Sequence, residues 1–209
     1  MNINFFPPDY RFANEMKLMI CNVLQNHPLS VNILTPAVLK ELTINVDVDF
    51  LDADKSPEIG CREYPQVKLC FGSNRYSNDG RFDSGKFRLE ILHEFVHLID
   101  RRNLGFGITE EKEKYAKKLS EDFSVAIHMD SWNCYINGRL WRKGIRIQSL
   151  EEFVKKRYGN KIRLGNIDKA TIELLYKKAW DSDQLTFDEI IELTKRVVSA
   201  FRDCPTANK

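Results

Sequence analysis

Residues 87–99 are apolar on nearly every side when they are read as a helix, and this feature constrains the fold most. A helix of this kind has to be covered over most of its surface, so it belongs in a core. The same helix carries His93, Glu94 and His97. Burying these three side chains costs free energy unless each has a polar partner. The apolar residues are Phe87, Leu89, Ile91, Leu92, Phe95, Val96, Leu98 and Ile99.

The spacing of the two histidines suits a metal ion. His93 and His97 are four residues apart, so a helix places both imidazoles on one face, where they can reach the same ion. Glu94 is rotated from His93 by roughly 100° and would lie beside the ion as a general base. Neutral imidazoles suit zinc, and an open position would hold water. With four histidines in 209 residues, chance produces this pattern in roughly 0.5% of such chains. The sequence predicts a zinc site; the alternative is a core helix with structural histidines.

A third ligand has to come from outside this pair. Asn103 stands where a metzincin carries its third histidine, which excludes that family. Asp100 lies three residues after His97 on the same helix, so it suits the orientation of an imidazole better than direct ligation. The two remaining histidines are His27 and His128.

The following helix offers an acidic ligand. It is expected to begin after the N-cap Thr109 and to continue through residue 127. At about 100° per residue, Glu113 is the first-turn acid nearest the apolar stripe, so it is the predicted third ligand. The alternative is a solvated charge in a lysine-rich run. If the helix is continuous, His128 lies fifteen residues and roughly 22 Å from Glu113 and cannot join it.

Glycines, prolines and alternating apolar residues mark the other elements. Helices are expected at residues 11–26 and directly after Pro36, and strands at residues 44–50 and 67–71. The second strand is a candidate edge to which an extended substrate could add main-chain hydrogen bonds; the alternative is an ordinary paired strand. Residues 72–86 are expected to form a polar loop whose sharpest turn is Asn78-Asp79-Gly80.

The last third of the chain is predicted to be helical. Its signals are two capping boxes and a C-terminal cap, at Ser149 with Glu152, Thr186 with Glu189, and Gly159. Strands and helices followed by helices alone indicate an α+β fold. We expect a zincin-like arrangement with a small mixed or antiparallel sheet, an active-site helix and a helical C-terminal lobe. The length fits a single domain, residues 1–209, with lobes at about residues 1–107 and 108–209.

Composition excludes several other classes. Apolar residues make up 43% of the chain and charged residues 30%, with a formal net charge of +2, so neither disorder nor a nucleic-acid-binding field is indicated. No apolar run approaches the ~18 residues of a membrane span, and the N-terminus lacks the pattern of a secretory signal or transit peptide. Five cysteines form no CxxC pair, which argues against a zinc ribbon. The basic residues 137–146 are expected to form a solvated face; the alternative is contact with anionic lipid headgroups.

Two motifs carry a family resemblance. The segments "HEFVHLID" and "EKYAKKLS" resemble the mitochondrial inner-membrane metalloprotease that is also an ATP synthase assembly factor, whose pattern is HExxHxxD followed by ExRAxxLSG. The resemblance extends from about residue 61 to 190, with weaker matches in "LC", "NR" and "TFDEI". Tyr115 and Glu121 depart from the second motif, and most of the family's cysteines are absent. The matching residues are His93, Glu94, His97, Asp100, Glu113, Ala116, Leu119 and Ser120.

The resemblance implies a zinc metalloendopeptidase with a gluzincin-like His-His-Glu site. It implies peripheral association with the mitochondrial inner membrane on the intermembrane-space side, and partners among the membrane-sector subunits of ATP synthase. The implied substrates are intermembrane-space proteins or the ATP synthase subunit 6 precursor. In this reading Glu94 accepts a proton from water and passes it to the leaving amine.

Two other hypotheses use the same residues. The first is an assembly chaperone that keeps the zinc site while proteolysis is dispensable; the change Glu94→Gln separates it from a protease. The second is a DNA-associated HExxH protease of the SprT type. That class calls for a third histidine in the downstream helix and a cysteine zinc ribbon, and the sequence offers neither, so no nucleic-acid partner is expected.

Overall fold

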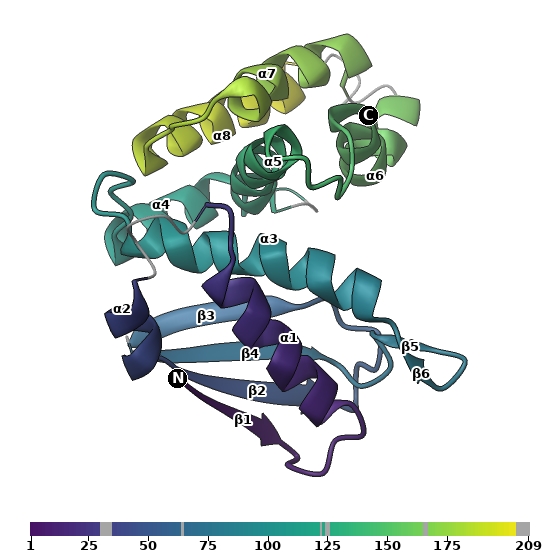
Figure 1. Ribbon diagram of the computed structural model, residues 1–209. Helices are drawn as coiled ribbons and strands as arrows, with labels where there is room; N and C mark the ends of the chain where they lie inside the picture. The colour runs from purple at the N-terminus through teal and green to yellow at the C-terminus, as the bar shows by residue number, and fades with distance from the viewer. Residues whose placement is uncertain (30–34, 64, 122, 124–125, 165–166, 204–209) are drawn as a thin grey trace. The chain divides into compact units, whose positions relative to one another are not determined.

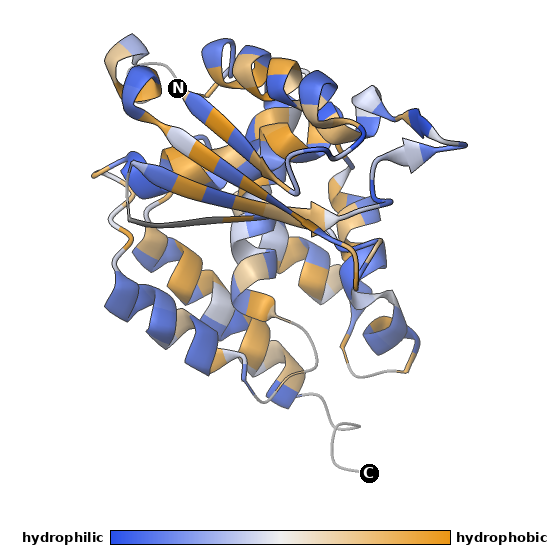
Figure 2. Ribbon diagram, turned by 90° about the horizontal axis from the view of Figure 1, so that it is seen from below, coloured by the Kyte–Doolittle hydropathy of each residue, from blue (hydrophilic) through white to orange (hydrophobic). Residues whose placement is uncertain are grey.

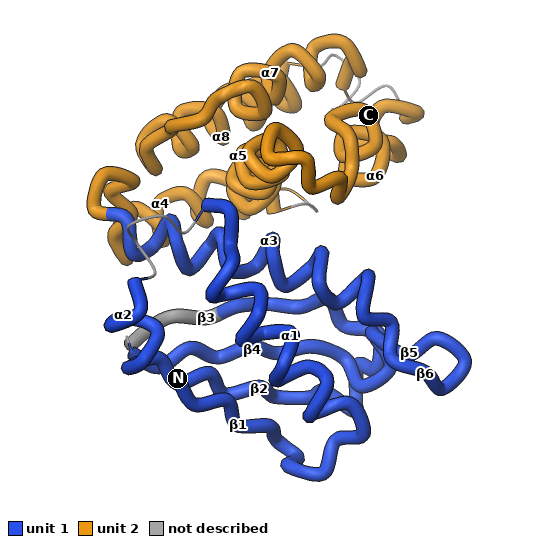
Figure 3. Tube along the Cα trace, in the orientation of Figure 1, with its two compact units in different colours: residues 1–103 blue, residues 104–209 orange. Residues whose placement is uncertain are grey.

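The computed structural model describes residues 1–29, 35–63, 65–121, 123, 126–164 and 167–203. These residues form an α+β structure with eight helices and a small mixed sheet, as the sequence predicts. The chain divides into two compact units, residues 1–103 and residues 104–209 (Figure 3). Unit 1 contains the sheet, and the described elements of unit 2 are all helices. That the whole chain is a single domain stays a prediction.

The main sheet of unit 1 has four strands in the order β1-β2-β4-β3 (Figure 1). The strands β1 (Asn2–Phe6), β2 (Thr43–Asp49) and β4 (Gln66–Gly72) are parallel, and β3 (Glu58–Glu63) runs antiparallel to β4. Of the two interpretations of residues 67–71, the sheet edge is wrong and the ordinary paired strand is correct, because β4 lies between β2 and β3. Apolar alternation locates a half-buried strand but does not show what pairs on either side of it. The edge beside β4 is β3, whose sequence shows little apolar alternation.

One face of this sheet carries the core of unit 1. Ile44 and Val46 in β2 are fully buried, whereas Asn45 and Asp47, which alternate with them, are half-buried, so the strand has one apolar and one polar face. Figure 2 shows this alternation as orange and blue bands along the strands. The helices α1 (Ala13–Gln25) and α3 (Ser84–Arg102) pack against each other on the same side of the sheet (Figure 1). The short helix α2 (Pro36–Glu41) precedes β2.

Helix α3 contains all of residues 87–99 and buries most of the apolar side chains there, as predicted. It begins after Asp83, whose side chain accepts a hydrogen bond from the backbone N–H of Lys86 at 2.9 Å. Just before it, part of the expected loop forms a hairpin of β5 (Ser77–Asn78) and β6 (Arg81–Phe82). The connecting residues Asp79 and Gly80 have positive φ angles of 49° and 77°, as a two-residue hairpin turn requires. The buried residues of α3 are Phe87, Ile91, Leu92, Phe95, Val96, His97, Leu98, Ile99 and Asp100.

Unit 2 contains five helices in its described residues. They are α4 (Glu110–Leu119), α5 (Ile127–Arg142), α6 (Leu150–Arg163), α7 (Lys169–Asp181) and α8 (Phe187–Arg202). Both predicted capping boxes are present, at the starts of α6 and α8. The predicted cap at Gly159 is wrong, because α6 continues four residues further, through Arg163.

The predicted continuous helix from Thr109 through residue 127 is also wrong. It starts at the expected N-cap, where Thr109 accepts a hydrogen bond from Lys112, but it ends at Leu119. The backbone N–H of Ser120 closes the last turn on the carbonyls of Lys117 and Lys118. Serine and aspartate compete with the helical backbone for hydrogen bonds, so "SED" after Leu119 favours an end rather than a continuation. The chain becomes helical again at α5.

Candidate metal centre

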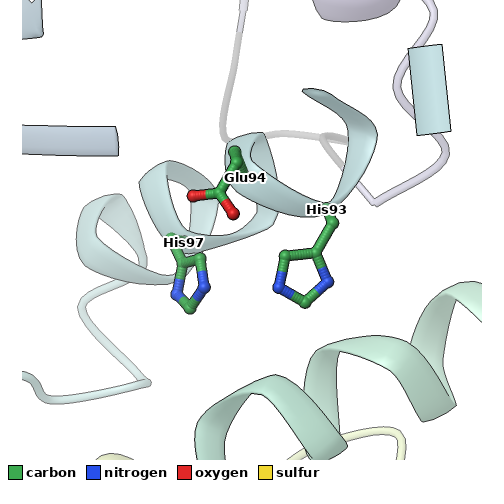
Figure 4. A group of neighbouring side chains, drawn as sticks. All are labelled: His93, Glu94 and His97. Carbon is green, nitrogen blue, oxygen red and sulfur yellow. The ribbon is translucent and has the colours of Figure 1, made fainter. Parts of the chain in front are cut away.

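Helix α3 brings three potential metal-binding side chains together. His93, Glu94 and His97 each offer one ligand atom, and these atoms lie within 4.8 Å of one another. Figure 4 shows both imidazole rings on the same side of the helix, with the carboxylate of Glu94 nearby. The arrangement follows from the helical period, which places residues four apart on one face. The grouping of the histidines that the sequence predicts is therefore present.

The two imidazoles differ in exposure. His97 is 4% exposed, and His93 is half-buried. Their ring centroids are 5.3 Å apart, with the ring planes at 73° to each other. Two rings that are crossed in this way can direct one nitrogen each toward a common point between them. A zinc-type ion, which favours imidazole nitrogen together with carboxylate oxygen, fits this donor set.

Glu94 lies in an environment that favours its protonated form. Burial is the main cause that raises the pKa of Glu94 to about 8. A hydrogen bond from the backbone N–H of Ile59 opposes this rise, while the negative charges of Glu90 and Glu58 add to it. Ile59 belongs to β3, which packs against α3. A carboxyl group whose pKa is near neutral pH can both accept and release a proton under physiological conditions.

A second carboxylate lies one helical turn before Glu94. Glu90 accepts two hydrogen bonds from Arg75, one from Nε to Oε2 at 3.2 Å and one from Nη2 to Oε1. This bidentate pair neutralises a charge that would otherwise lie unpaired beside Glu94. The neighbouring Tyr76 is fully buried, and burial raises the pKa of its hydroxyl far above the ordinary value. Sequence reasoning missed the pair. The spacing of Glu90 and Glu94 was available as a signal, but the reach of Arg75 to Glu90 depends on the hairpin between them.

The other predicted site residues have less direct support. Asp100 is 1% exposed on α3, in a position consistent with an orienting role that stays a prediction. In unit 2, Glu113 is half-buried while Glu110 and Glu111 are exposed. Among these three acids, Glu113 is therefore the one nearest the packed side of α4, as predicted. Its role as third ligand stays a prediction.

The structure removes the reason for excluding His128. The separation of roughly 22 Å holds only along one unbroken helix, and α4 ends before α5 begins. The Nδ1 atom of His128 lies 2.8 Å from Oγ of Ser120, the residue that ends α4. The imidazole is therefore held against the helix that carries Glu113.

Comparisons with protein-family models, with curated proteins and with solved structures find no match for this chain. None of the helices in the described residues has the length and apolar content needed to cross a lipid bilayer.

Proposed function

We propose that this protein is a zinc-dependent metalloendopeptidase with a zincin-like active site. The observation that carries the proposal is the His93-Glu94-His97 cluster, whose ligand atoms lie within 4.8 Å of one another on α3. Two imidazoles and an acid at this spacing are the elements that metal-assisted peptide hydrolysis requires.

Each residue has a separate role in this proposal. His93 and His97 hold the metal ion, with Glu113 as the predicted third ligand. A bound zinc ion would polarise the scissile carbonyl and make water more acidic. Glu94 accepts the proton of the attacking water and passes it to the leaving amine. Burial raises its pKa to about 8 when no metal is bound. The positive charge of an ion lowers that pKa toward neutrality.

The edge strand β3 gives an extended substrate a place to bind. Within the described sheet, β3 pairs only with β4, so its other edge offers backbone N–H and C=O groups. A peptide that adds to this edge gains main-chain hydrogen bonds regardless of its side chains. The backbone of Ile59 in β3 also donates a hydrogen bond to Glu94. A peptide on β3 therefore lies close to the general base.

The resemblance in the two motifs supports a narrower proposal about substrates. It favours proteins of the mitochondrial inner membrane and intermembrane space, including the ATP synthase subunit 6 precursor. The proposed peptidase activity depends on the α3 cluster and does not depend on which proteins are the substrates. The activity and the choice of substrate can therefore be tested separately.

Cleavage of a mixed peptide library tests the activity. The wild-type protein with zinc should cut peptides, and Glu94→Gln should reduce cleavage by at least about 100-fold while it keeps zinc, since loss of a general base costs about 10²–10⁴-fold. Glu111→Gln removes an exposed carboxylate and is the matched control that should retain activity. Cleavage by the Glu94 variant at the wild-type rate would refute the assignment.

A further inference from the structure

The strand β1 forms an unprotected edge of the main sheet. It is the outermost strand in Figure 1, and within the described sheet it pairs only with β2. Natural sheet edges are commonly kept apart from other chains by charged side chains, prolines or bulges. The residues of β1 include neither a charged residue nor a proline, and the register of β1 against β2 runs without a break. An edge of this kind favours pairing with another strand.

The backbone groups of Ile3 and Phe5 point away from β2. The N–H of Asn2 donates to the carbonyl oxygen of Leu42 at 2.9 Å, so the backbone of Asn2 faces β2. Successive residues of a strand direct their N–H and C=O groups to opposite sides, and Ile3 and Phe5 therefore face outward. No described residue makes a hydrogen bond with the backbone of either one. The edge offers a donor and an acceptor at each of these two residues.

This pattern of donors and acceptors is complementary to itself. In an antiparallel pair, opposite residues whose backbones point toward each other exchange both of their N–H···O=C bonds. If two copies of β1 run antiparallel with Asn4 opposite Asn4, then Ile3 of each copy lies opposite Phe5 of the other. Every outward-facing donor and acceptor of these residues is then used. A two-fold axis at Asn4 relates the copies, and such an arrangement closes as a dimer.

The side chains of β1 suit the same pairing. Phe5 is 3% exposed on the core face of the sheet, and Ile3, which is half-buried, would be covered further by Phe5 of the second copy. On the opposite face, Phe6 is 53% exposed and would lie against Asn2 of the second copy. The two Asn4 amides, which both donate and accept hydrogen bonds, meet at the axis. No like charges of β1 come together.

We propose that β1 is a dimerisation edge, to which a second copy of this chain adds its own β1 in antiparallel orientation. The two four-stranded sheets then form one continuous sheet. The partner is a second copy because the free backbone groups, centred on Asn4, match themselves and no charge opposes the match. An edge of five residues gives a small interface, so we expect a dissociation constant of about 1–100 µM. The pairing uses no residue of α3 and leaves β3 free, so it is independent of the proposed function.

Sedimentation equilibrium of the full chain between about 1 and 500 µM tests the dimer. The wild type should change from monomer to dimer across this range. Asn4→Lys and Asn4→Asp each place like charges opposite each other at the axis, and each should raise the dissociation constant by at least about tenfold. An equal mixture of the two variants places a lysine opposite an aspartate and should dimerise again. Only a position that faces its own copy gives this recovery.

Asn78→Lys is the matched control. It adds the same charge at an exposed asparagine of β5, outside the main sheet, and should dimerise as the wild type does. Nδ2 of Asn4 donates to Oδ1 of Asn45 at 3.1 Å, and because this bond is exposed, its loss should leave the thermal stability of the monomer nearly unchanged. A wild type that stays monomeric over the whole range, or a mixture of the Asn4 variants that stays monomeric, would overturn the proposal.

Amide hydrogen exchange of the wild type locates the interface without any variant. The N–H groups of Ile3 and Phe5 have no partner among the described residues of one chain, so only the dimer protects them by hydrogen bonds. Both should exchange at least about tenfold more slowly in concentrated than in dilute protein. A dimer in which both exchange equally fast at the two concentrations would show that the copies meet at another surface, and would overturn the proposal.

Discussion

Glu94 links the chemistry of the site to the stability of the metal-free protein. Its folded-state pKa of about 8 is above the ordinary value for a glutamate, 4.5. Below pH 4.5 both the folded and the unfolded state bind the proton, so the group has no effect on stability there. As the pH rises from 4.5 to 8, the unfolded state releases the proton while the folded state retains it. The folded state therefore loses stability over this range, by at most about 1.4 kcal/mol per pH unit.

This pH dependence should disappear when the carboxyl group is removed. Urea unfolding of the metal-free wild type should show a lower free energy of unfolding at pH 7.5 than at pH 5, and Glu94→Gln should show a smaller decrease. The difference between the two proteins is the relevant quantity, because other groups titrate equally in both. Parallel pH profiles for the two proteins would show that Glu94 is solvated and has an ordinary pKa.

The pair of Arg75 and Glu90 should be energetically coupled. Both side chains are only about one-fifth exposed, at 21% and 22%, and their bidentate geometry is favourable. A double-mutant cycle with Arg75→Ala and Glu90→Ala, followed by urea unfolding, should give a coupling energy of about 1–2 kcal/mol. A coupling energy near zero would place the pair among ordinary exposed ion pairs.

Individual site residues differed in how far the sequence could predict them. His93, Glu94 and His97 were predictable because a helix places residues four apart on one face, whatever the rest of the chain does. The residues that contact them could not be predicted from the sequence. Ile59 reaches Glu94 through the pairing and packing of β3, a strand that local alternation did not reveal. Such contacts depend on tertiary structure, which the spacing of apolar residues within one element does not reveal.

Two glycines within helices should respond in opposite directions to the same substitution. Gly138 in α5 lies against the backbone of Trp180 in α7, so closely that a Cβ atom would overlap it. Gly159 in α6 has room, since the nearest atom to an added Cβ is Lys155 Cγ at 4.0 Å. Gly138→Ala should therefore lower the free energy of unfolding by about 1–3 kcal/mol, through overpacking.

Gly159→Ala should raise the free energy of unfolding by about 0.5–1 kcal/mol, because alanine favours the helix. Thermal and urea unfolding of both variants measure the two effects. Stabilisation by Gly138→Ala of the same size as that by Gly159→Ala would show that α5 and α7 do not pack as closely as the structure indicates.

At the level of elements, starts were easier to predict than ends. The N-caps Thr109, Ser149 and Thr186 were all predicted correctly, because a side chain that caps the first turn acts within three residues. Helix ends depend on competing signals. Gly159 looked like a stop, yet α6 continues past it, whereas α4 stops at Leu119 without a glycine. That second error was also the premise on which His128 was excluded as a ligand.

For the whole molecule, composition and element order were sufficient for the fold class. Strands interleaved with helices and then helices alone predicted an α+β chain, and the described residues have this order. The order of strands in the sheet was beyond such patterns, because it depends on long-range pairing, including the parallel pairing of β1 with β2. The chemistry is predicted most firmly in unit 1, where two histidines and a glutamate share one helix.

Zinc content per chain, measured by elemental analysis after purification and reconstitution, tests the metal centre most directly. The wild type and Glu94→Gln should each hold one zinc per chain, since Glu94 is assigned as a base and not as a ligand. His97→Ala should lose most of it, because it removes one of the two imidazoles that α3 supplies. A folded wild-type protein that binds no zinc, or a His97 variant that binds it as tightly as the wild type, would contradict a metal centre on α3.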